Sequence, residues 1–497
     1  MDKPTLQGGN MSYLLAIDQG TTSTRCVVYD HELNVISSTQ QEYPLIYPDD
    51  GWVEVNPRVL LHSVYKSLDS ILSQSLDIVC AGITNQRETT LVWDAKSGET
   101  IFNGIVWQDR RTADYCNSFK DQGLEPVIQE KTGLLLDPYF SASKIAWILD
   151  NVDGARANAQ AGNLRFGTVD TFLLWHLSDG KNHKTDVTNA SRTSLFNIHT
   201  LQWDNELLEI FNIPLSMLPE VCNSDANFGS LYRNGQTIPI TGMIGDQQSA
   251  LVGQSCFDGG DMKATFGTGC FLMVNSGSKP QISSSRLLST IGYQLNGDLH
   301  YALEGSIFSA GTIIQWLRDR MEFFEDSKSS IELLSSSGQS NGALFVPAFT
   351  GIGAPHWNAE VRAAFYGITR DTSKQDMVTA AFKALIYQVI DIKEALKDDG
   401  ITIQSLAVDG GMANNQKFCQ LLADYLELNL NVPASTESTA LGAAITAGFG
   451  HGIFSSQAEV QQSPELITIY SPREDFKDAE DLAKWREFMQ LLMGAYN

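Results

Sequence analysis

The chain has 497 residues, of which 43% are hydrophobic and 19% charged, so it has the composition of a globular protein with two or three domains. Its formal net charge of −24 argues against binding to nucleic acid or to anionic membranes, and no apolar run is long enough to span a membrane. The N-terminus lacks an apolar secretion signal, so residues 1–11 are expected to form a polar leader. Seven separated cysteines form no CxxC motif, which predicts free thiols and a cytoplasmic protein.

The first predicted element is a β-hairpin. An apolar strand over 13–17 ends at Asp18, and after a short polar turn a second strand covers 24–29. A third strand at 35–40 is expected to continue this meander. A similar strand, turn and strand recur at 263–275, which suggests that the chain consists of two related halves.

Further strands are predicted at 78–84, 89–93, 238–244 and 406–409. Helices are expected between them. The clearest covers 375–398, because apolar residues recur there at helical spacing and Ser373 with Asp376 has the pattern of a capping box. A second helix is expected over 414–425, and the Ser- and Gly-rich segment 326–342 is expected to end in a surface loop. This alternation predicts an α/β fold with mixed sheets, with a domain boundary near 253–260.

Two turns combine glycine with hydroxyl side chains, namely 18–23 (DQGTTS) and 267–269 (GTG). Glycine lets the backbone approach a ligand closely, and successive N–H groups can bind an anion. Two such turns facing each other would hold a polyphosphate, with Asp18 near Mg²⁺; a polar hairpin turn is the alternative for each. The glycines at 410–411, followed by Asn415, can admit adenosine or phosphate, although a tight strand-to-helix connection explains them as well.

Three other segments carry groups suited to a small polyhydroxylated ligand. Arg87 and Glu88, in the turn 85–89, can hydrogen-bond hydroxyl groups, unless the turn is solvated. Trp107 can pack on a polyol's carbon atoms, unless it is a core residue beside a helix. Asp246 follows a strand and is a candidate general base; the alternative is a helix N-cap.

Taken together, these segments resemble the FGGY family of carbohydrate kinases over about 12–455. The matching stretches include AIDQGTTSTR, GITNQRETTLVWD, IVWQDRRTA, GDQQSALVGQ, TFGTGCFLMVN and DGGMANN. Residues 139–151 (YFSASKIAWILDN) fit the first signature of the family, and the second signature departs only at its last position, Lys383. The segments NQRET, WQDRR and GDQQ are similar to those of members that phosphorylate glycerol, rather than pentuloses or gluconate.

This resemblance implies two actin-like (ribonuclease H-like) ATPase domains with mixed sheets and a central cleft. Residues 12–254 would bind glycerol and phosphate, and residues 255–497 the nucleotide. The implied activity is ATP-dependent phosphorylation of glycerol to sn-glycerol 3-phosphate, the first step of glycerol catabolism, with Mg²⁺ as cofactor. A homodimer or homotetramer is implied as well.

The resemblance also assigns roles by matching position. The residues expected to bind glycerol are Arg87, Glu88, Trp107, Tyr139, Asp246, Gln247 and Phe271. Those expected to meet the nucleotide are Thr21, Thr22, Ser23, Arg25, Thr268, Gly311, Gln315, Gly411 and Asn415. The expected catalytic residues are Asp246, Asp18 and Thr22. Asp18 and Asp246 would lie near Mg²⁺, and Asp246 would act as the base.

Three alternatives stay open at this point: a kinase for another polyol or ketose, an actin-like protein that assembles or acts as a chaperone, and a non-catalytic glycerol sensor. The segments that carry regulation in known members depart here from the family pattern. Those controlled by fructose 1,6-bisphosphate carry a Gly-rich loop with arginine, whereas residues 228–237 are shorter and offer only Arg233. Others are activated at a phosphorylated histidine, and none lies between His199 and His300. Neither control is therefore expected.

Overall fold

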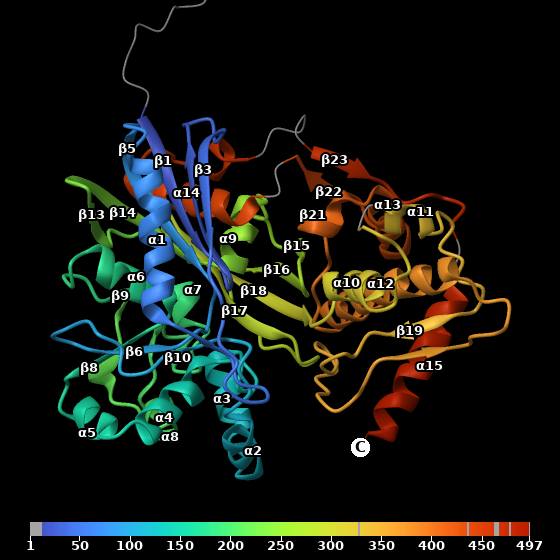
Figure 1. The fold of residues 1–497 in the computed structure, drawn as a ribbon, viewed down its shortest axis with the longest axis horizontal. Helices are drawn as coiled ribbons and strands as arrows, with labels where there is room; N and C mark the ends of the chain where they lie inside the picture. Colours follow the sequence, from blue (N-terminus) through green and yellow to red (C-terminus); the bar gives the residue numbers. More distant parts are fainter. Residues whose placement is uncertain (1–11, 327–328, 435–436, 462–466, 477–478, 497) are drawn as a thin grey trace, which may run out of the picture.

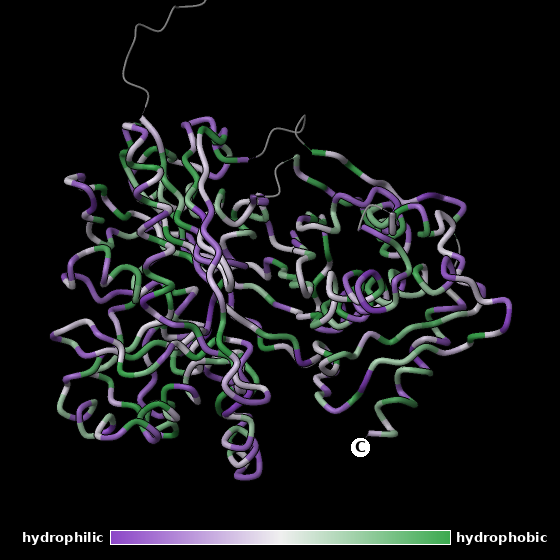
Figure 2. The backbone as a smooth tube through the Cα atoms, in the orientation of Figure 1, coloured by the Kyte–Doolittle hydropathy of each residue, from purple (hydrophilic) through white to green (hydrophobic). Residues whose placement is uncertain are grey.

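A computed structural model describes residues 12–326, 329–434, 437–461, 467–476 and 479–496, so the leader predicted over 1–11 lies outside the described residues. Two halves lie side by side, each with a central sheet (Figure 1). Figure 2 shows hydrophobic residues along the inner strands and packed helices, and hydrophilic residues in outer segments such as the tip of α2. This distribution is expected when each sheet is covered on its faces.

A six-stranded mixed sheet forms the centre of the first half. Its spatial order is β13-β14-β5-β1-β2-β3, with β1 (Ser12–Gln19), β2 (Ser23–Tyr29), β3 (Val35–Glu42), β5 (Asp77–Asn85), β13 (Gly229–Arg233) and β14 (Gln236–Gly245). The first three strands form the predicted antiparallel meander, and β5 and β14 run parallel to β1. The carboxyl ends of β1, β5 and β14 therefore meet at one edge, which is where ligands bind in open α/β sheets.

The second half contains a seven-stranded mixed sheet in the order β17-β18-β16-β15-β21-β22-β23. Its strands are β15 (Asp261–Phe266), β16 (Cys270–Gly277), β17 (Leu288–Leu295), β18 (Asp298–Ile307), β21 (Ser405–Asp409), β22 (Leu430–Pro433) and β23 (Ile467–Tyr470). Here β15, β16, β18 and β17 are successively antiparallel, and β21 and β22 run parallel to β15, much as β5 and β14 run parallel to β1 beside the antiparallel strands of the first sheet. The strand, turn and strand predicted at both places are thus present, each at the start of its sheet.

Helices and short strands fill the intervals. The helices are α1 (Pro57–Leu72), α2 (Ala113–Asp121), α3 (Glu125–Thr132), α4 (Ser141–Asn151), α5 (Ala155–Gln160), α6 (Val169–Leu177), α7 (Val187–Ala190), α8 (Asn205–Ile210), α9 (Asp246–Gly253), α10 (Gly311–Asp319), α11 (Ser329–Leu333), α12 (Lys374–Asp398), α13 (Gln416–Leu426), α14 (Ser438–His451) and α15 (Ala479–Ala495). The short strands are β4 (Glu54–Val55), β6 (Leu91–Asp94), β7 (Gly104–Ile105), β8 (Leu164–Gly167), β9 (Lys184–Asp186), β10 (Phe196–Asn197), β11 (Gln202–Trp203), β12 (Glu220–Cys222), β19 (Leu344–Val346) and β20 (Ala364–Tyr366). The described residues also form the 3₁₀ turns η1 (Leu215–Met217), η2 (Gly411–Asn414) and η3 (Gln457–Glu459).

One local prediction is confirmed and two need refinement. The capping box of α12 is present, because Ser373 and Asp376 each accept a hydrogen bond from the other's backbone N–H. The segment 326–342, however, contains the short helix α11 as well as loop. The strand predicted at 89–93 begins only at Leu91, and as β6 it pairs with β8 outside the main sheet.

The C-terminal helix α15 packs on the second half. Trp485 is buried and donates its indole N–H to the Phe345 carbonyl at 2.7 Å. Lys383, the residue that departs from the second signature, lies in α12 and pairs with Asp481 of α15 at 2.6 Å. The buried charge of Lys383 is therefore neutralised by an acidic partner in α15.

Helix α14 comes late in the sequence but packs on the first sheet (Figure 1). The approach is close enough to require glycine: a Cβ on Gly82 of β5 would lie 2.1 Å from the Ala443 carbonyl oxygen, and one on Gly442 would lie 1.8 Å from that of Ser249. Leu14 and Ala443 accordingly belong to one buried cluster. The division at 254/255 stays a prediction, since residues 438–451 share a core with the first half.

The buried His183 is expected to make the folded protein less stable at acid pH. It lies between Trp93 and Trp175, and burial lowers its pKa to about 4. As the pH falls, the His183 imidazole is therefore protonated in the unfolded chain before it is protonated in the folded chain. The free energy of unfolding decreases as the pH falls from about 6.5 towards 4, by at most about 2 kcal/mol at pH 5. H183Q is expected to show a smaller drop in Tm between pH 7.5 and pH 5.0 than the wild type. Equal drops, measured by thermal unfolding, would show that His183 does not contribute.

Candidate active site

The edge formed by β1, β5 and β14 brings the predicted polar residues together. Gln19 of β1 and Gly245 of β14 are both register partners of Asn85, the last residue of β5. Asp18 therefore lies near the start of the turn that follows Asn85, and Asp246 begins α9 directly after β14. Gly245, not Asp246, holds the N-cap position, so the simple capping alternative for Asp246 is wrong.

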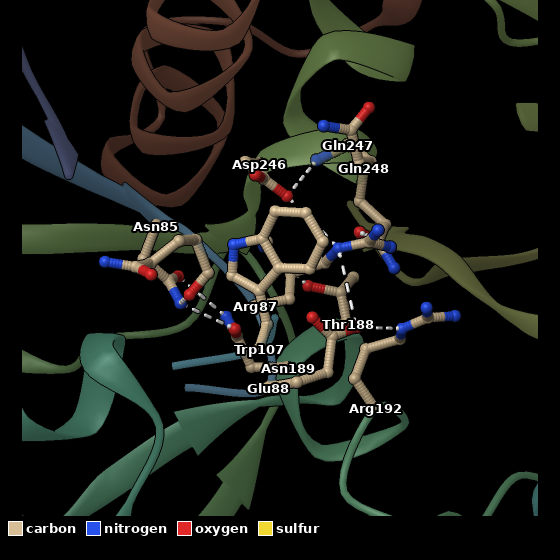
Figure 3. A network of polar contacts seen from close by, with 12 residues as sticks. Asn85, Arg87, Glu88, Trp107, Thr188, Asn189, Arg192, Asp246, Gln247 and Gln248 are labelled. Atoms are coloured by element: carbon tan, nitrogen blue, oxygen red, sulfur yellow. Dashed lines mark hydrogen bonds and ion pairs between the residues drawn. The ribbon is translucent and has the colours of Figure 1, made fainter. Parts of the chain in front are cut away.

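The turn after β5 is buried rather than solvated. Arg87 is 3% exposed and Glu88 1%, which excludes the solvated-turn alternative. Glu88 has a left-handed backbone (φ 60°), and the turn is anchored by paired carboxamides: Asn85 Nδ2 donates to Asn189 Oδ1 at 2.9 Å, and Asn189 returns the bond at 3.1 Å (Figure 3). The surrounding structure thus holds two charged side chains in one fixed orientation.

Arg87 is the hub of the site (Figure 3). Its Nε lies 3.1 Å from Asp246 Oδ1, and its Nη2 donates to the Tyr139 hydroxyl at 3.5 Å. Its Nη1 donates to Glu304 Oε2 at 2.6 Å and to Gln248 Oε1 at 3.2 Å. The structure therefore brings together the predicted residues Arg87, Tyr139 and Asp246.

Sequence reasoning missed two charged residues behind this group. Arg192 is fully buried, and it donates from Nε to Glu88 Oε1 at 2.6 Å and from Nη2 to Glu304 Oε1 at 2.9 Å. Glu304 is also fully buried, and its arginine partners lower its pKa to about 2 despite the cost of burial. A glutamate within the apolar run YALEGSI was the available signal, because a charge inside a buried strand needs partners.

Aromatic side chains form one wall of the site. The ring of Trp107 lies edge-on to Tyr139 at 5.7 Å and to Phe271 at 5.9 Å between centroids. Its indole Nε1 donates to Thr21 Oγ1 at 3.0 Å, which joins this wall to the first hydroxyl-rich turn. Trp107 packs against the core of the first half but is only partly buried, so part of its ring stays accessible to a ligand. Tyr139 is supported from behind by the buried Lys144, whose ammonium donates to its carbonyl and to that of Pro138.

The carboxylates at the sheet edge carry raised pKa values. Burial, opposed by Arg25 and reinforced by the charge of Asp246, raises the pKa of Asp18 to about 7. Burial also raises the pKa of Asp246, although its side chain keeps 27% exposure. Gln247 donates its backbone N–H to Asp246 at 2.7 Å, and its side-chain oxygen accepts from Lys263, a buried cation that sequence reasoning missed. Asp246 is thus a carboxylate within reach of a ligand.

The second hydroxyl-rich turn is tied to α10. The Thr268 carbonyl accepts from the N–H groups of Ala310 and Thr312, and the Gly267 carbonyl accepts from Gly311. Gln315 lies one turn further along α10. Thr268, Gly311 and Gln315 are therefore brought to one place, as predicted for a nucleotide site, while their contacts with ATP stay predictions.

Of the other residues predicted to meet the nucleotide, two are engaged in hydrogen bonds or ion pairs within the chain. Arg25 pairs with Glu437 and donates to Gln40 at 2.9 Å, and the Asn415 side chain caps α13 by accepting from the Phe418 N–H. The remaining three lie in turns or at the start of a strand, namely Thr22, Ser23 and Gly411. Thr22 is exposed, so its hydroxyl is accessible to a ligand.

Arg233, the one arginine in the segment 228–237, lies in the β13–β14 hairpin and forms a two-pronged ion pair with Asp69 at 2.6 and 2.7 Å. It also lies over the ring of Tyr65 at 4.4 Å. These partners within the chain already engage its guanidinium, and the absence of control by a phosphate effector stays a prediction.

Comparison with known proteins identifies relatives along most of the chain. The N-terminal domain of the FGGY family of carbohydrate kinases matches residues 13–253, and its C-terminal domain matches 262–451. Glycerol kinase of Marinomonas sp. is 51% identical over 455 residues, covering 90% of this chain and 92% of the relative. Glycerol kinase of Nitrosomonas eutropha is 48% identical over 494 residues, covering 98% and 99%. The crystal structure of Plasmodium falciparum glycerol kinase with ADP superimposes with a TM-score of 0.90 at 35% identity, covering 98% and 99%.

Proposed function

We infer that this chain, which belongs to the FGGY family of carbohydrate kinases, is a glycerol kinase that transfers the terminal phosphate of ATP to glycerol. The observation that supports glycerol as the substrate is the group formed by the buried Arg87 with the partly exposed Asp246 and Tyr139, beside the wall formed by Trp107 and Phe271. Fixed charged groups on one side and aromatic faces on the other suit a short polyol, because they match its hydroxyl groups and its carbon atoms separately.

Each residue's part in the reaction follows from its chemistry. Glycerol offers only neutral hydroxyls, so charged partners such as Arg87 and Glu88 make stronger and more directional hydrogen bonds than neutral ones. Trp107 packs on the carbon chain. Asp246 accepts the proton of a terminal hydroxyl as its oxygen bonds to phosphorus and the bond to ADP breaks. The hydroxyl-rich turns at 20–23 and 267–269 hold the phosphates in line with that oxygen.

A magnesium ion fits the carboxylates at the sheet edge. Burial is the main cause of the raised pKa of Asp18, and the negative charge of Asp246 adds to it; a divalent cation near both carboxylates would favour their charged forms. No cluster of three or more potential metal ligands occurs among the described residues, which suits Mg²⁺ held mainly by phosphates and water. When bound, Mg²⁺ would neutralise charge on the phosphates. Asp18 and Asp246 are the residues that would hold it.

Asp18→Asn tests this assignment. We expect kcat to fall by about 10²-fold and the Mg²⁺ concentration for half-maximal activity to rise, because one carboxylate is lost. Binding of Mn²⁺ with ATP, measured by electron paramagnetic resonance, should weaken in parallel. The control is Asp30→Asn, at the far end of β2, where the carboxylate only caps a turn. Unchanged Mn²⁺ binding in D18N would remove Asp18 from the metal site.

The direct test of function is ADP release from Mg-ATP with glycerol, dihydroxyacetone, erythritol or xylulose. Strong stimulation by glycerol is expected, and a preference for another compound would change the substrate but not the phosphate chemistry. ATP-dependent assembly without glycerol-stimulated turnover would favour an actin-like assembling protein instead. ATP binding with glycerol binding but no turnover would favour a sensor.

Other expectations stay proposals. The product would be sn-glycerol 3-phosphate, and the protein would be a cytoplasmic homodimer or homotetramer. In the described part of the chain, none of the helices is both long and apolar enough to cross a membrane.

A further inference from the structure

Glu304 reaches the glycerol site from the other half of the chain. It lies in β18, within the sheet of the second half, and its side chain is fully buried. Both of its ion-pair partners, Arg87 and Arg192, belong to the first half. A buried charge that joins two halves of a molecule must be matched accurately, since leaving it unpaired is costly.

The two carboxylate oxygens of Glu304 serve different partners. Oε2 accepts from Arg87 Nη1 at 2.6 Å, and Oε1 accepts from Arg192 Nη2 at 2.9 Å. Arg192 in turn donates from Nε to Glu88 at 2.6 Å. Glu304 is thus linked to two of the three charged residues proposed to bind glycerol, directly to Arg87 and through Arg192 to Glu88.

These bonds decide which edge of Arg87 faces the substrate. Nη1 is taken by Glu304 and Gln248, and Nε lies against Asp246. Nη2 is directed to the Tyr139 hydroxyl at the longer distance of 3.5 Å, on the side of the aromatic wall. A planar guanidinium held at two of its edges has one orientation for the third.

The charges of the cluster also balance. Its cations are Arg87, Arg192 and Lys263, and its carboxylates are Glu88, Glu304 and Asp246. A neutral side chain at position 304 would leave an excess positive charge between Arg87 and Arg192. We expect Arg87 then to turn towards Asp246 and Glu88, because these carboxylates already lie 3.1 and 3.8 Å from its Nε.

We propose that Glu304 is a positioning residue for glycerol, which aims the free edge of Arg87 and, through Arg192, the carboxylate of Glu88. This inference rests on the proposed function. It follows that the second half of the chain influences glycerol affinity through Glu304, although Glu304 itself does not contact glycerol. A purely structural ion pair would stabilise the fold but would leave the balance between glycerol and ATP binding unchanged.

Glu304→Gln tests the proposal, because it keeps the shape and removes the charge. We expect the glycerol KM, and the glycerol Kd measured by calorimetry without ATP, to rise by roughly tenfold or more, while the ATP KM stays within about twofold. The matched control is Glu54→Gln. Glu54 is likewise buried and paired with a buried arginine, Arg111, at 2.8 Å, and it contacts none of the proposed glycerol residues. E54Q should lower Tm but leave the glycerol Kd unchanged.

Two further variants keep the test decisive. E304D retains the charge on a shorter side chain, so it should raise the glycerol KM less than E304Q; if E304Q does not fold, E304D alone must still raise it. R192K should raise the glycerol KM as well, and combining it with E304D should add little, because both act through one bridge. An unchanged glycerol KM in folded E304Q or E304D, or an equal rise in the ATP KM, overturns the proposal. Absence of glycerol-dependent turnover in the wild type would instead overturn the proposed function.

Discussion

Asp246→Asn is expected to lower kcat by about 10³-fold while the glycerol KM changes only a few fold. The amide has the size of the carboxylate and can still contact Arg87, but it cannot accept the proton of the attacking hydroxyl. The partial exposure of Asp246 and its place directly after β14 make it the carboxylate best placed for this transfer. Steady-state kinetics with glycerol and ATP varied separately would measure both parameters.

A suitable control is Asp225→Asn. Asp225 is also a half-buried aspartate whose pKa burial raises, but its partner is the Asn296 backbone N–H, outside the proposed site. Its replacement should leave kcat unchanged. If D246N kept the wild-type kcat, Asp246 would not be the base, and the base would have to be sought among the other titratable groups of the proposed site.

Arg87→Ala is expected to weaken both glycerol binding and the fold. Removing this buried guanidinium leaves Glu304 with one arginine partner and Asp246 without its nearest cation, which should cost about 3–5 kcal/mol of unfolding free energy. The glycerol Kd should rise far more than the ATP KM, because we propose that the guanidinium contacts glycerol and not ATP. Thermal unfolding and calorimetric titration with glycerol would measure the two effects.

Arg233→Ala is the control for the loss of unfolding free energy expected in R87A. This arginine pairs with Asp69 at the surface, where an ion pair contributes about 1 kcal/mol or less because water competes for both charges. R233A should therefore lower Tm slightly and leave glycerol binding intact. A wild-type Tm in R87A, or equal losses of glycerol and ATP affinity, would contradict the central place given to Arg87.

The local elements were predictable because their causes lie within a few residues. Alternating apolar residues and polar turns located β1, β2 and β14 to within two residues. Ser373 and Asp376 marked the start of α12 through a bond between neighbours. Aspartate and glycine residues at strand ends likewise predicted a ligand-binding site at the edge of the sheet. The family motifs extended this to named side chains such as Arg87 and Asp246.

What the tertiary structure alone decided are the contacts between distant segments. The partners of Arg87 come from residues more than 50, 150 and 200 positions further along, and no short-range pattern pairs Arg87 with Glu304 or Arg192 with Glu88. The packing of α14 against the first sheet is equally non-local. Sequence by itself determined the strands, the turns and the chemical groups they carry, since hydrogen bonds and side-chain periodicity act locally. Which buried charges neutralise one another depends on how the two sheets are placed, and only the folded chain brings those charges within bonding distance.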